Sequence, residues 1–250
     1  MKLARLNQGP EIFHTIQGEG ASAGCPAVFI RTSRCNLHCI WCDTDHTWNF
    51  EGTPWPHQKD GQPGYAKFKK EEVTFEISPQ DAADAILQYD CDRVVITGGE
   101  PLLQADACLE LIQAVRAKRP AAVFEVETNG TQIPSPELAE AVNQFNVSPK
   151  LANSGMKPEL RIQPEALREL AALSGSWFKF VVTDPQDLAE IEVLLDDHGI
   201  PASKVILMPE GRNSETLDQR AAWLAETCRN KGFRYGERLH VRLWGDKRGV

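Results

Sequence analysis

The sequence has no apolar run that approaches the roughly 20 residues needed to cross a bilayer. Basic residues are in the minority, because 27 Lys and Arg stand against 35 Asp and Glu, which gives a formal net charge of −8. A chain of this charge lacks the basic surface typical of DNA- and RNA-binding proteins. The first residues, Met1–Arg5, are followed by a polar segment, unlike a secretory signal peptide. We therefore expect a cytoplasmic protein that binds neither nucleic acid nor a membrane.

The cysteines do not suggest a disulfide framework. There are seven, an odd number, and three of them form a C-x3-C-x2-C motif: Cys35, Cys39 and Cys42. In a reducing compartment this clustering favours metal ligation over disulfide bonds. We expect Cys91, Cys108 and Cys228 to be ordinary thiols.

The composition is that of an ordinary globular protein, with 42% hydrophobic and 25% charged residues over 250 positions. Short segments rich in Val, Ile and Phe predict strands that are buried on both faces. The predicted strands are residues 27–32, 93–97, 123–127, 145–148, 177–183, 204–208 and 239–243. Segments with helical spacing separate most of them; they follow the Ser78-Pro79 cap and lie near residues 109–115, 136–143, 164–173, 187–197 and 214–230.

This alternation implies an α/β fold with parallel strands and right-handed crossovers. An open (β/α) barrel and a doubly wound sheet both fit the order of elements. The alternation breaks at about residues 47–75, where proline, glycine and polar residues follow one another without periodicity. A loop this long is usually functional or mobile, but a surface insertion without a role fits equally well. We place no domain boundary there and expect one domain over residues 1–250.

Three thiolates in a loop directly after a strand can hold three irons of a [4Fe–4S] cluster. The fourth iron then stays open for cofactor or substrate chemistry. The alternative is a zinc site, with His38 or Cys25 as a further ligand. Zinc usually takes paired ligands such as C-x2-C with a second pair downstream, so the spacing favours the cluster.

The cysteine motif resembles that of the radical S-adenosylmethionine (SAM) superfamily, whose fold is a partial (β/α) barrel. Residues 97–101, Thr-Gly-Gly-Glu-Pro, are similar to the GGEP motif of the superfamily. The resemblance implies that Cys35, Cys39 and Cys42 ligate a [4Fe–4S] cluster. It also implies that the backbone of Gly98 and Gly99, with Glu100, holds the methionine amino group of SAM.

Within the superfamily, the chain resembles the 7-carboxy-7-deazaguanine synthase family. The similarity rests on Thr15-Ile16-Gln17-Gly18-Glu19-Gly20, Arg31 at the end of the first predicted strand, Cys42-Asp43-Thr44, Glu127-Thr128-Asn129-Gly130 and Ser148-Pro149-Lys150. The resemblance implies ring contraction of 6-carboxy-5,6,7,8-tetrahydropterin to 7-carboxy-7-deazaguanine with loss of ammonia, on the way to queuosine and related deazapurines. It further implies a flavodoxin- or ferredoxin-like electron donor, a homodimer, and an insertion after the cluster loop.

Residue roles follow from the same resemblance. Thr44 matches a Mg2+ ligand, although it could instead cap the next turn. Arg31 could pair with the substrate carboxylate or form a structural ion pair with a glutamate. The positions matching substrate contacts are Ile16, Gln17, Gly18, Glu19, Arg31 and Thr97. Those matching SAM contacts are Trp41, Cys42, Asp43, Gly98, Gly99, Glu100, Ser148, Pro149, Lys150 and Met208.

Two other functions share part of this pattern. A small radical SAM activase, which installs a radical on a partner protein, would have the same cysteines and GGEP motif. It would not need the Gln17–Glu19 segment or Thr44. The second alternative is a non-catalytic iron–sulfur or zinc module.

Overall fold

The computed structural model describes residues 1–250 and is built on one mixed sheet whose parallel strands lie side by side in chain order. These strands are β4 (Pro26–Thr32), β6 (Arg93–Gly98), β7 (Val123–Thr128), β8 (Gln144–Val147), β9 (Ser176–Val182), β10 (Val205–Pro209) and β11 (Arg234–Tyr235). A doubly wound sheet reverses its strand order at a switch point, and no reversal occurs between β4 and β11. The sheet does not close on itself, so the fold is the expected partial (β/α) barrel.

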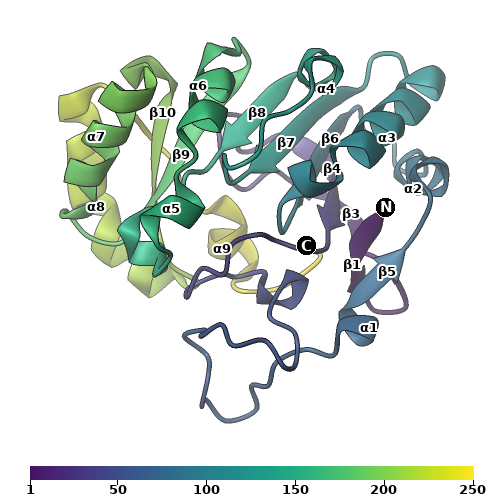
Figure 1. Ribbon diagram of the computed structural model, residues 1–250, viewed down its shortest axis with the longest axis horizontal. Helices are drawn as coiled ribbons and strands as arrows, with labels where there is room; N and C mark the ends of the chain where they lie inside the picture. Colours follow the sequence, from purple (N-terminus) through teal and green to yellow (C-terminus); the bar gives the residue numbers. More distant parts are fainter.

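Helices follow the strands and cover the outer side of the curved sheet, as Figure 1 shows for α3, α4, α6, α7 and α8. The helices are α1 (Lys70–Val73), α2 (Pro79–Ile86), α3 (Ala105–Lys118), α4 (Pro136–Ala141), α5 (Pro158–Arg161), α6 (Pro164–Ala172), α7 (Asp187–His198), α8 (Ser214–Lys231) and α9 (Leu239–Trp244). The Ser78 cap is confirmed, since its hydroxyl accepts a 3.0 Å hydrogen bond from the amide of Asp81. No helix combines the length and apolar character that a membrane span requires.

The hydrophobic core lies between the strands and these helices. Phe124, Phe145, Phe178 and Phe180 are the largest of its fully buried side chains, and all four lie on consecutive parallel strands. Burying large apolar surface in this way is the main source of stability in such a fold. The core therefore keeps the carboxyl ends of neighbouring strands in a fixed relation, which is where α/β folds carry their ligands.

The amino-terminal strands were not predicted. β1 (Lys2–Leu6), β2 (Gly9–Pro10), β3 (Ile12–Ile16) and β5 (Thr74–Glu76) are short and antiparallel to their neighbours. β3 pairs with β4 along its whole length. This pairing brings the segment that follows β3, with Gln17 and Glu19, to the carboxyl-terminal edge of the parallel strands.

The predicted strand at residues 239–243 is wrong, because these residues form α9. The alternating pattern Leu-His-Val-Arg-Leu suggested a strand, but only Val241 is buried. The amide of Leu239 instead donates to the carbonyl of Gly18, and the helix ends at Gly245, which has a φ of +68°. β11 takes the edge position beside β10.

Candidate functional site

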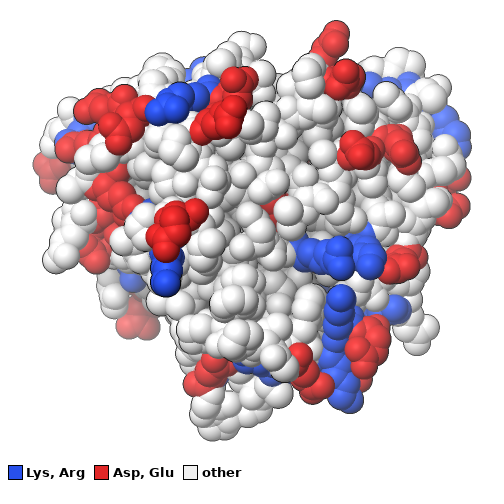
Figure 2. Space-filling model, in the orientation of Figure 1, with Lys and Arg blue, Asp and Glu red and all other residues white.

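A cavity of about 250 Å³ lies at the carboxyl ends of the parallel strands. It is lined by all three motif cysteines, by the segment after β3 and by the C-terminal residues 245–250. On the face drawn in Figure 2, charged side chains gather mainly toward the rim, and the centre of the view carries few of them. The predicted residues that line the cavity are Ile16, Gln17, Gly18, Glu19, Arg31, Cys35, Cys39, Trp41, Cys42, Asp43, Thr44, Thr97, Gly98, Gly99, Ser148, Lys150 and Met208.

The cysteine loop directly follows β4, as predicted. The amide of Ile40 donates to the carbonyl of Ser154 at 3.0 Å, which fixes the loop against the segment after β8. Cys39 is 5% exposed, and burial raises the pKa of its thiol to about 12. A thiolate at this position therefore needs a strong cation beside it, and the irons of a cluster meet that need.

The donor set fits a cluster better than a single metal ion. Nowhere in the structure do three His, Cys, Asp or Glu side chains converge closely enough to bind one ion. Ligands of a structural zinc must converge in this way. Thiolates that bind three different irons of a cubane do not share one centre. The three motif cysteines all line the cavity, where they could hold a cluster, as the sequence predicts.

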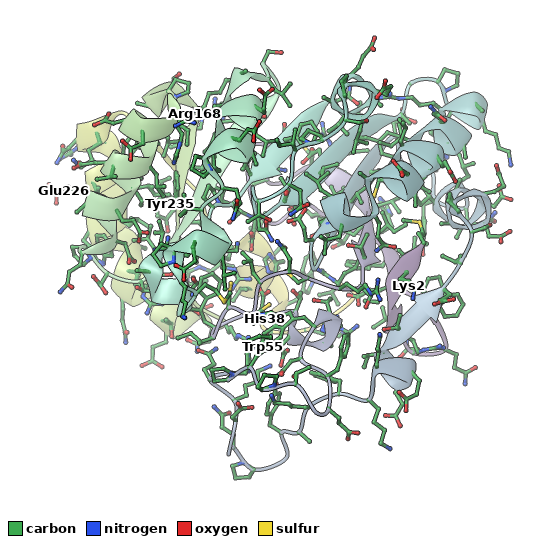
Figure 3. The ribbon with its side chains drawn as sticks, viewed as in Figure 1. Lys2, His38, Trp55, Arg168, Glu226 and Tyr235 are labelled. Carbon is green, nitrogen blue, oxygen red and sulfur yellow. The ribbon has the colours of Figure 1, made fainter.

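The segment from about residue 47 to 75 packs over the cysteine loop. The ring of Trp55 stacks on His38 with ring centroids 4.1 Å apart, and both are labelled in Figure 3. His57 is buried, and its Nε2 lies 2.9 Å from the carbonyl oxygen of Cys42. The insertion therefore holds the loop in place rather than being a surface feature without contacts.

The glycines of the GGEP motif allow two backbone segments to meet. A Cβ on Gly99 would lie 2.0 Å from the carbonyl oxygen of Arg34, and a Cβ on Gly98, whose φ is +135°, would lie 2.2 Å from the carbonyl oxygen of Thr32. No side chain fits there, so the end of β6 packs directly on the start of the cysteine loop. The prediction explained these glycines by contact with a ligand; the structure adds contact with the chain's own backbone.

Glu100 and Pro149 do not line the cavity. The Glu100 carboxylate is fully buried and accepts hydrogen bonds from the amides of Leu102 and Asn129 and from the hydroxyl of Thr128, at 3.0, 2.7 and 2.8 Å. All three hydrogen-bond donors belong to the chain itself. Glu100 thus joins the motif after β6 to the Thr-Asn-Gly turn after β7.

Two residues predicted to contact SAM, Lys150 and Ser148, lie close to Trp41. The Lys150 ammonium lies 5.7 Å from the centre of the Trp41 ring and donates to the Ser148 hydroxyl at 2.9 Å. The indole nitrogen of Trp41 donates to the carbonyl of Asn153 at 2.9 Å. Met208 is buried at the end of β10 and also lines the cavity.

Thr44 lines the cavity and does not act as a cap. It precedes the short 3-10 helix at residues 45–47, but its side chain accepts no capping hydrogen bond. Its hydroxyl lies 3.6 Å from the sulfur of Cys42. Thr44 thus brings a hydroxyl oxygen, a ligand type that hard cations prefer, to the wall of the cavity beside the cysteine loop.

A polar network forms the wall between β3, β6 and β7. Gln17 is 1% exposed, and its amide nitrogen donates to Oε1 of Glu127 at 3.2 Å. The other oxygen of Glu127 accepts from the Thr97 hydroxyl at 2.7 Å. Glu127 thus lines the cavity together with Gln17 and Thr97, although from the sequence its segment was notable only as a family match.

The Glu19 carboxylate is held by two cations. Lys179 pairs with one oxygen, and Nε of Arg238 donates to the other at 3.0 Å. Burial raises the pKa of Glu19, but Lys179 and Arg238 outweigh it and hold that pKa well below its usual range. Glu19 is therefore ionised at neutral pH. Neither cation was predicted, although a lysine within the apolar run of β9 was a visible signal.

Arg31 forms an ion pair through one nitrogen and also lines the cavity. Its Nε donates to Oε1 of Glu11 at 2.9 Å, whereas its two terminal nitrogens make no hydrogen bond within the chain. Arg31 itself lines the cavity. The structural ion pair considered from the sequence is therefore present, and it leaves part of the guanidinium free.

Comparison with known proteins shows which family the chain is similar to. The profile described as the Radical SAM superfamily matches residues 29–173, more than half of the chain. The chain is 36% identical to a 7-carboxy-7-deazaguanine synthase of Pyrobaculum aerophilum, over 96% of this chain and 95% of that protein. It is 38% identical to a 7-carboxy-7-deazaguanine synthase of Halobacterium salinarum, over 94% of this chain and 90% of that protein.

A solved structure, that of QueE from Escherichia coli, matches 96% of this chain and 95% of its own with a TM-score of 0.65 and 26% identity. The similarity therefore extends over the whole fold and is not confined to the cysteine loop. The chain belongs to the 7-carboxy-7-deazaguanine synthase family of the radical SAM superfamily.

Proposed function

We propose that the chain converts 6-carboxy-5,6,7,8-tetrahydropterin into 7-carboxy-7-deazaguanine with release of ammonia, a step of queuosine and deazapurine biosynthesis. One observation carries the proposal: a single cavity joins the three motif cysteines to a wall of buried polar side chains around Gln17 and Arg31. A pterin offers a planar edge of donors and acceptors and, here, a carboxylate. Such a ligand needs the few convergent polar groups that this wall provides.

A [4Fe–4S] cluster and SAM are the cofactors of this family. When bound, they supply the one-electron chemistry that removes a hydrogen atom from a substrate carbon. The chain's own contribution is to hold the reactants in register and to exclude water. Cys35, Cys39 and Cys42 would hold the cluster, and the insertion that packs on His38 and Cys42 would shield it.

The SAM side of the cavity comprises Trp41, Asp43, Gly98, Gly99, Ser148, Lys150 and Met208. A cation over an indole face and a hydroxyl next to it suit a ligand that carries a carboxylate and an aromatic base. Glu100 and Pro149 stay in this assignment as residues that support the binding loops, because they do not reach the cavity.

The substrate side comprises Ile16, Gln17, Gly18, Glu19, Arg31 and Thr97, to which Glu127 is added. The free terminal nitrogens of Arg31 fit the substrate carboxylate. Thr44 is proposed to bind Mg2+ together with that carboxylate. Its hydroxyl has no capping role that would compete with the metal.

The chain would act as one domain, because residues from β3 to the C-terminal tail line the same cavity. The electron donor is proposed to be a small flavodoxin- or ferredoxin-like protein. A cytoplasmic homodimer completes the proposal, and light scattering of purified protein tests the assembly.

Anaerobic turnover with carboxytetrahydropterin, SAM and Mg2+, followed by mass spectrometry, tests the function. We expect 7-carboxy-7-deazaguanine and ammonia in equal amounts. Formation of 5′-deoxyadenosine without either product would contradict the substrate assignment. Radical transfer to an added protein instead would favour an activase.

A further inference from the structure

The guanidinium of Arg238 joins the two sides of the cavity. Arg238 lies immediately before α9 and is 7% exposed. Its Nε donates to Oε1 of Glu19 at 3.0 Å, and its Nη2 pairs with Oδ2 of Asp43. Its third nitrogen, Nη1, donates to the carbonyl of Gly211 at 2.7 Å, beyond the end of β10. One side chain thus contacts the segment after β3, the cysteine loop and the segment after β10.

The two carboxylates depend on Arg238 to different degrees. Glu19 keeps Lys179 as a second cation, whereas the only side-chain ion pair of Asp43 is the one with Arg238. A movement of Asp43 must therefore move Arg238 or leave a buried guanidinium with a partner missing. Loss of one member of such a charged pair is costly, so the two loops should shift together.

The segment next to Arg238 packs on the same substrate loop. The amide of Leu239 donates to the carbonyl of Gly18 at 2.9 Å. A Cβ on Gly18 would lie 2.2 Å from Nδ1 of His240, so only glycine allows this approach. The loop of Gln17, Gly18 and Glu19 is therefore also contacted by Leu239 and His240, which directly follow the residue that pairs with Asp43.

We propose that Arg238 is a positioning residue that couples the SAM side of the cavity to the substrate side. SAM that binds at Asp43 orders the Gln17–Glu19 loop through Arg238, and substrate bound by that loop tightens SAM by the same factor, as linkage requires. This inference rests on the proposed function only for the assignment of Asp43 to SAM and of the loop to the pterin. Lysine cannot replace the arginine, because a single ammonium lacks the three-way fork.

Hydrogen exchange with SAM alone tests this coupling without turnover. The protein is reconstituted anaerobically with its cluster, and amide exchange is measured by mass spectrometry with and without saturating SAM. In the wild type, we expect SAM to slow exchange in peptides that cover residues 16–20 by about fivefold or more, the lower end of typical coupling. In Arg238→Met, this protection should fall below about twofold at equal iron content.

Arg242→Met is the matched control. Arg242 lies on α9, four residues after Arg238, and pairs with Asp218 and Glu237, but it does not line the cavity. Its loss should leave the SAM-dependent protection intact. Equal loss in both variants would show that general loosening of α9 is responsible and would overturn the proposal, as would unchanged protection in Arg238→Met. If Arg238→Met does not retain its cluster, Arg238→Lys decides by the same criterion.

A second measurement uses the substrate. The SAM dissociation constant of the wild type should fall about fivefold or more when carboxytetrahydropterin is present, and this change should disappear in Arg238→Lys. Wild-type turnover together with an unchanged coupling factor in Arg238→Lys would overturn the role of Arg238 and leave the proposed function standing. Absence of wild-type turnover would overturn the proposed function, while the exchange experiment with SAM alone still decides the coupling.

Discussion

Arg31 and Glu11 form an ion pair at the edge of the cavity, with 2.9 Å between Nε of Arg31 and Oε1 of Glu11. The Glu11 side chain is 1% exposed, and its second oxygen pairs with Arg248 from the C-terminal tail and lies 3.3 Å from Nε2 of His46. One buried carboxylate therefore positions both the proposed substrate clamp and the tail that lines the cavity. The two interpretations of Arg31 are thus compatible, because the ion pair fixes the guanidinium and leaves its terminal nitrogens free.

Glu11 should make stability depend on pH in the acidic range. Burial raises the pKa of Glu11, but Arg31 and His46 outweigh it and hold the pKa well below its usual range. A group whose pKa is lower in the folded state stabilises fully above its unfolded value of about 4.3, and its contribution is lost as pH falls below that value. Glu11→Gln should therefore lower the free energy of unfolding at pH 7 by about 3 kcal/mol and flatten its decline below about pH 5.

Urea unfolding of cluster-free protein under reducing conditions, followed by tryptophan fluorescence at several pH values, measures this effect. Glu76→Gln is the control, because Glu76 pairs with Lys2 but its side chain is 73% exposed. Exposed pairs contribute about 0–1 kcal/mol. If Glu11→Gln and Glu76→Gln show the same free energy of unfolding at each pH, the buried ion pair stabilises the fold no more than the exposed one.

Cys39→Ala should abolish SAM cleavage and lower the iron content after reconstitution, because a missing thiolate leaves the cluster under-ligated. Cys91→Ala should behave like the wild type, since Cys91 lies outside the cavity beside Pro26. Iron analysis and deoxyadenosine formation are measured on the same samples. Wild-type cleavage with a full iron load in Cys39→Ala would refute the cluster assignment.

Thr44→Ala should weaken Mg2+ activation more than SAM binding, because the hydroxyl is the proposed ligand of the metal. Thr44→Ser keeps a hydroxyl and should restore most of the response. Product formation is titrated with Mg2+ for all three proteins at saturating SAM. Superimposed curves for Thr44→Ala and the wild type would remove Thr44 from the metal site.

Lys150→Met should raise the dissociation constant for SAM by about tenfold or more, since a charged hydrogen bond contributes about 1.5–3 kcal/mol. Lys157→Met is the control, because Lys157 is a nearby exposed lysine that does not line the cavity. Binding is measured anaerobically on the reconstituted proteins. Equal affinities of the two variants would indicate that Lys150 only faces solvent and Trp41.

The parallel part of the fold could be predicted because its strands are apolar on both faces and alternate with helices. Phe145 and Phe178, for example, are fully buried and lie in short apolar runs of the kind that predict buried strands. β1 and β3 were missed because their local sequence indicates a strand only weakly. They are strands because they pair with β4, which lies further along the chain. Residues 239–243 alternate like a strand, but contact with Gly18 makes them helical.

The site was predictable where residues are adjacent in sequence, as in the cysteine motif and the Gln17–Glu19 segment. It was not predictable where distant residues meet. Arg238 lies 219 positions from Glu19 and 195 from Asp43, and only the folded chain brings the three together. Glu127 is an intermediate case, because it belongs to a motif but its bond to Gln17 is visible only in the structure.

Paired measurement of radical formation and product on Arg31→Lys tests the central claim most directly, that one half of the cavity activates SAM and the other binds the pterin. Lysine keeps a cation beside Glu11 but loses the fork that would clamp the substrate carboxylate. At matched iron content, deoxyadenosine formed with a strong reductant and no pterin should stay within about twofold of the wild type. Formation of 7-carboxy-7-deazaguanine should fall by about thirtyfold or more, since loss of a charged hydrogen bond costs about 2–5 kcal/mol. A parallel fall of both activities, or a fall of neither, would contradict this division of the cavity.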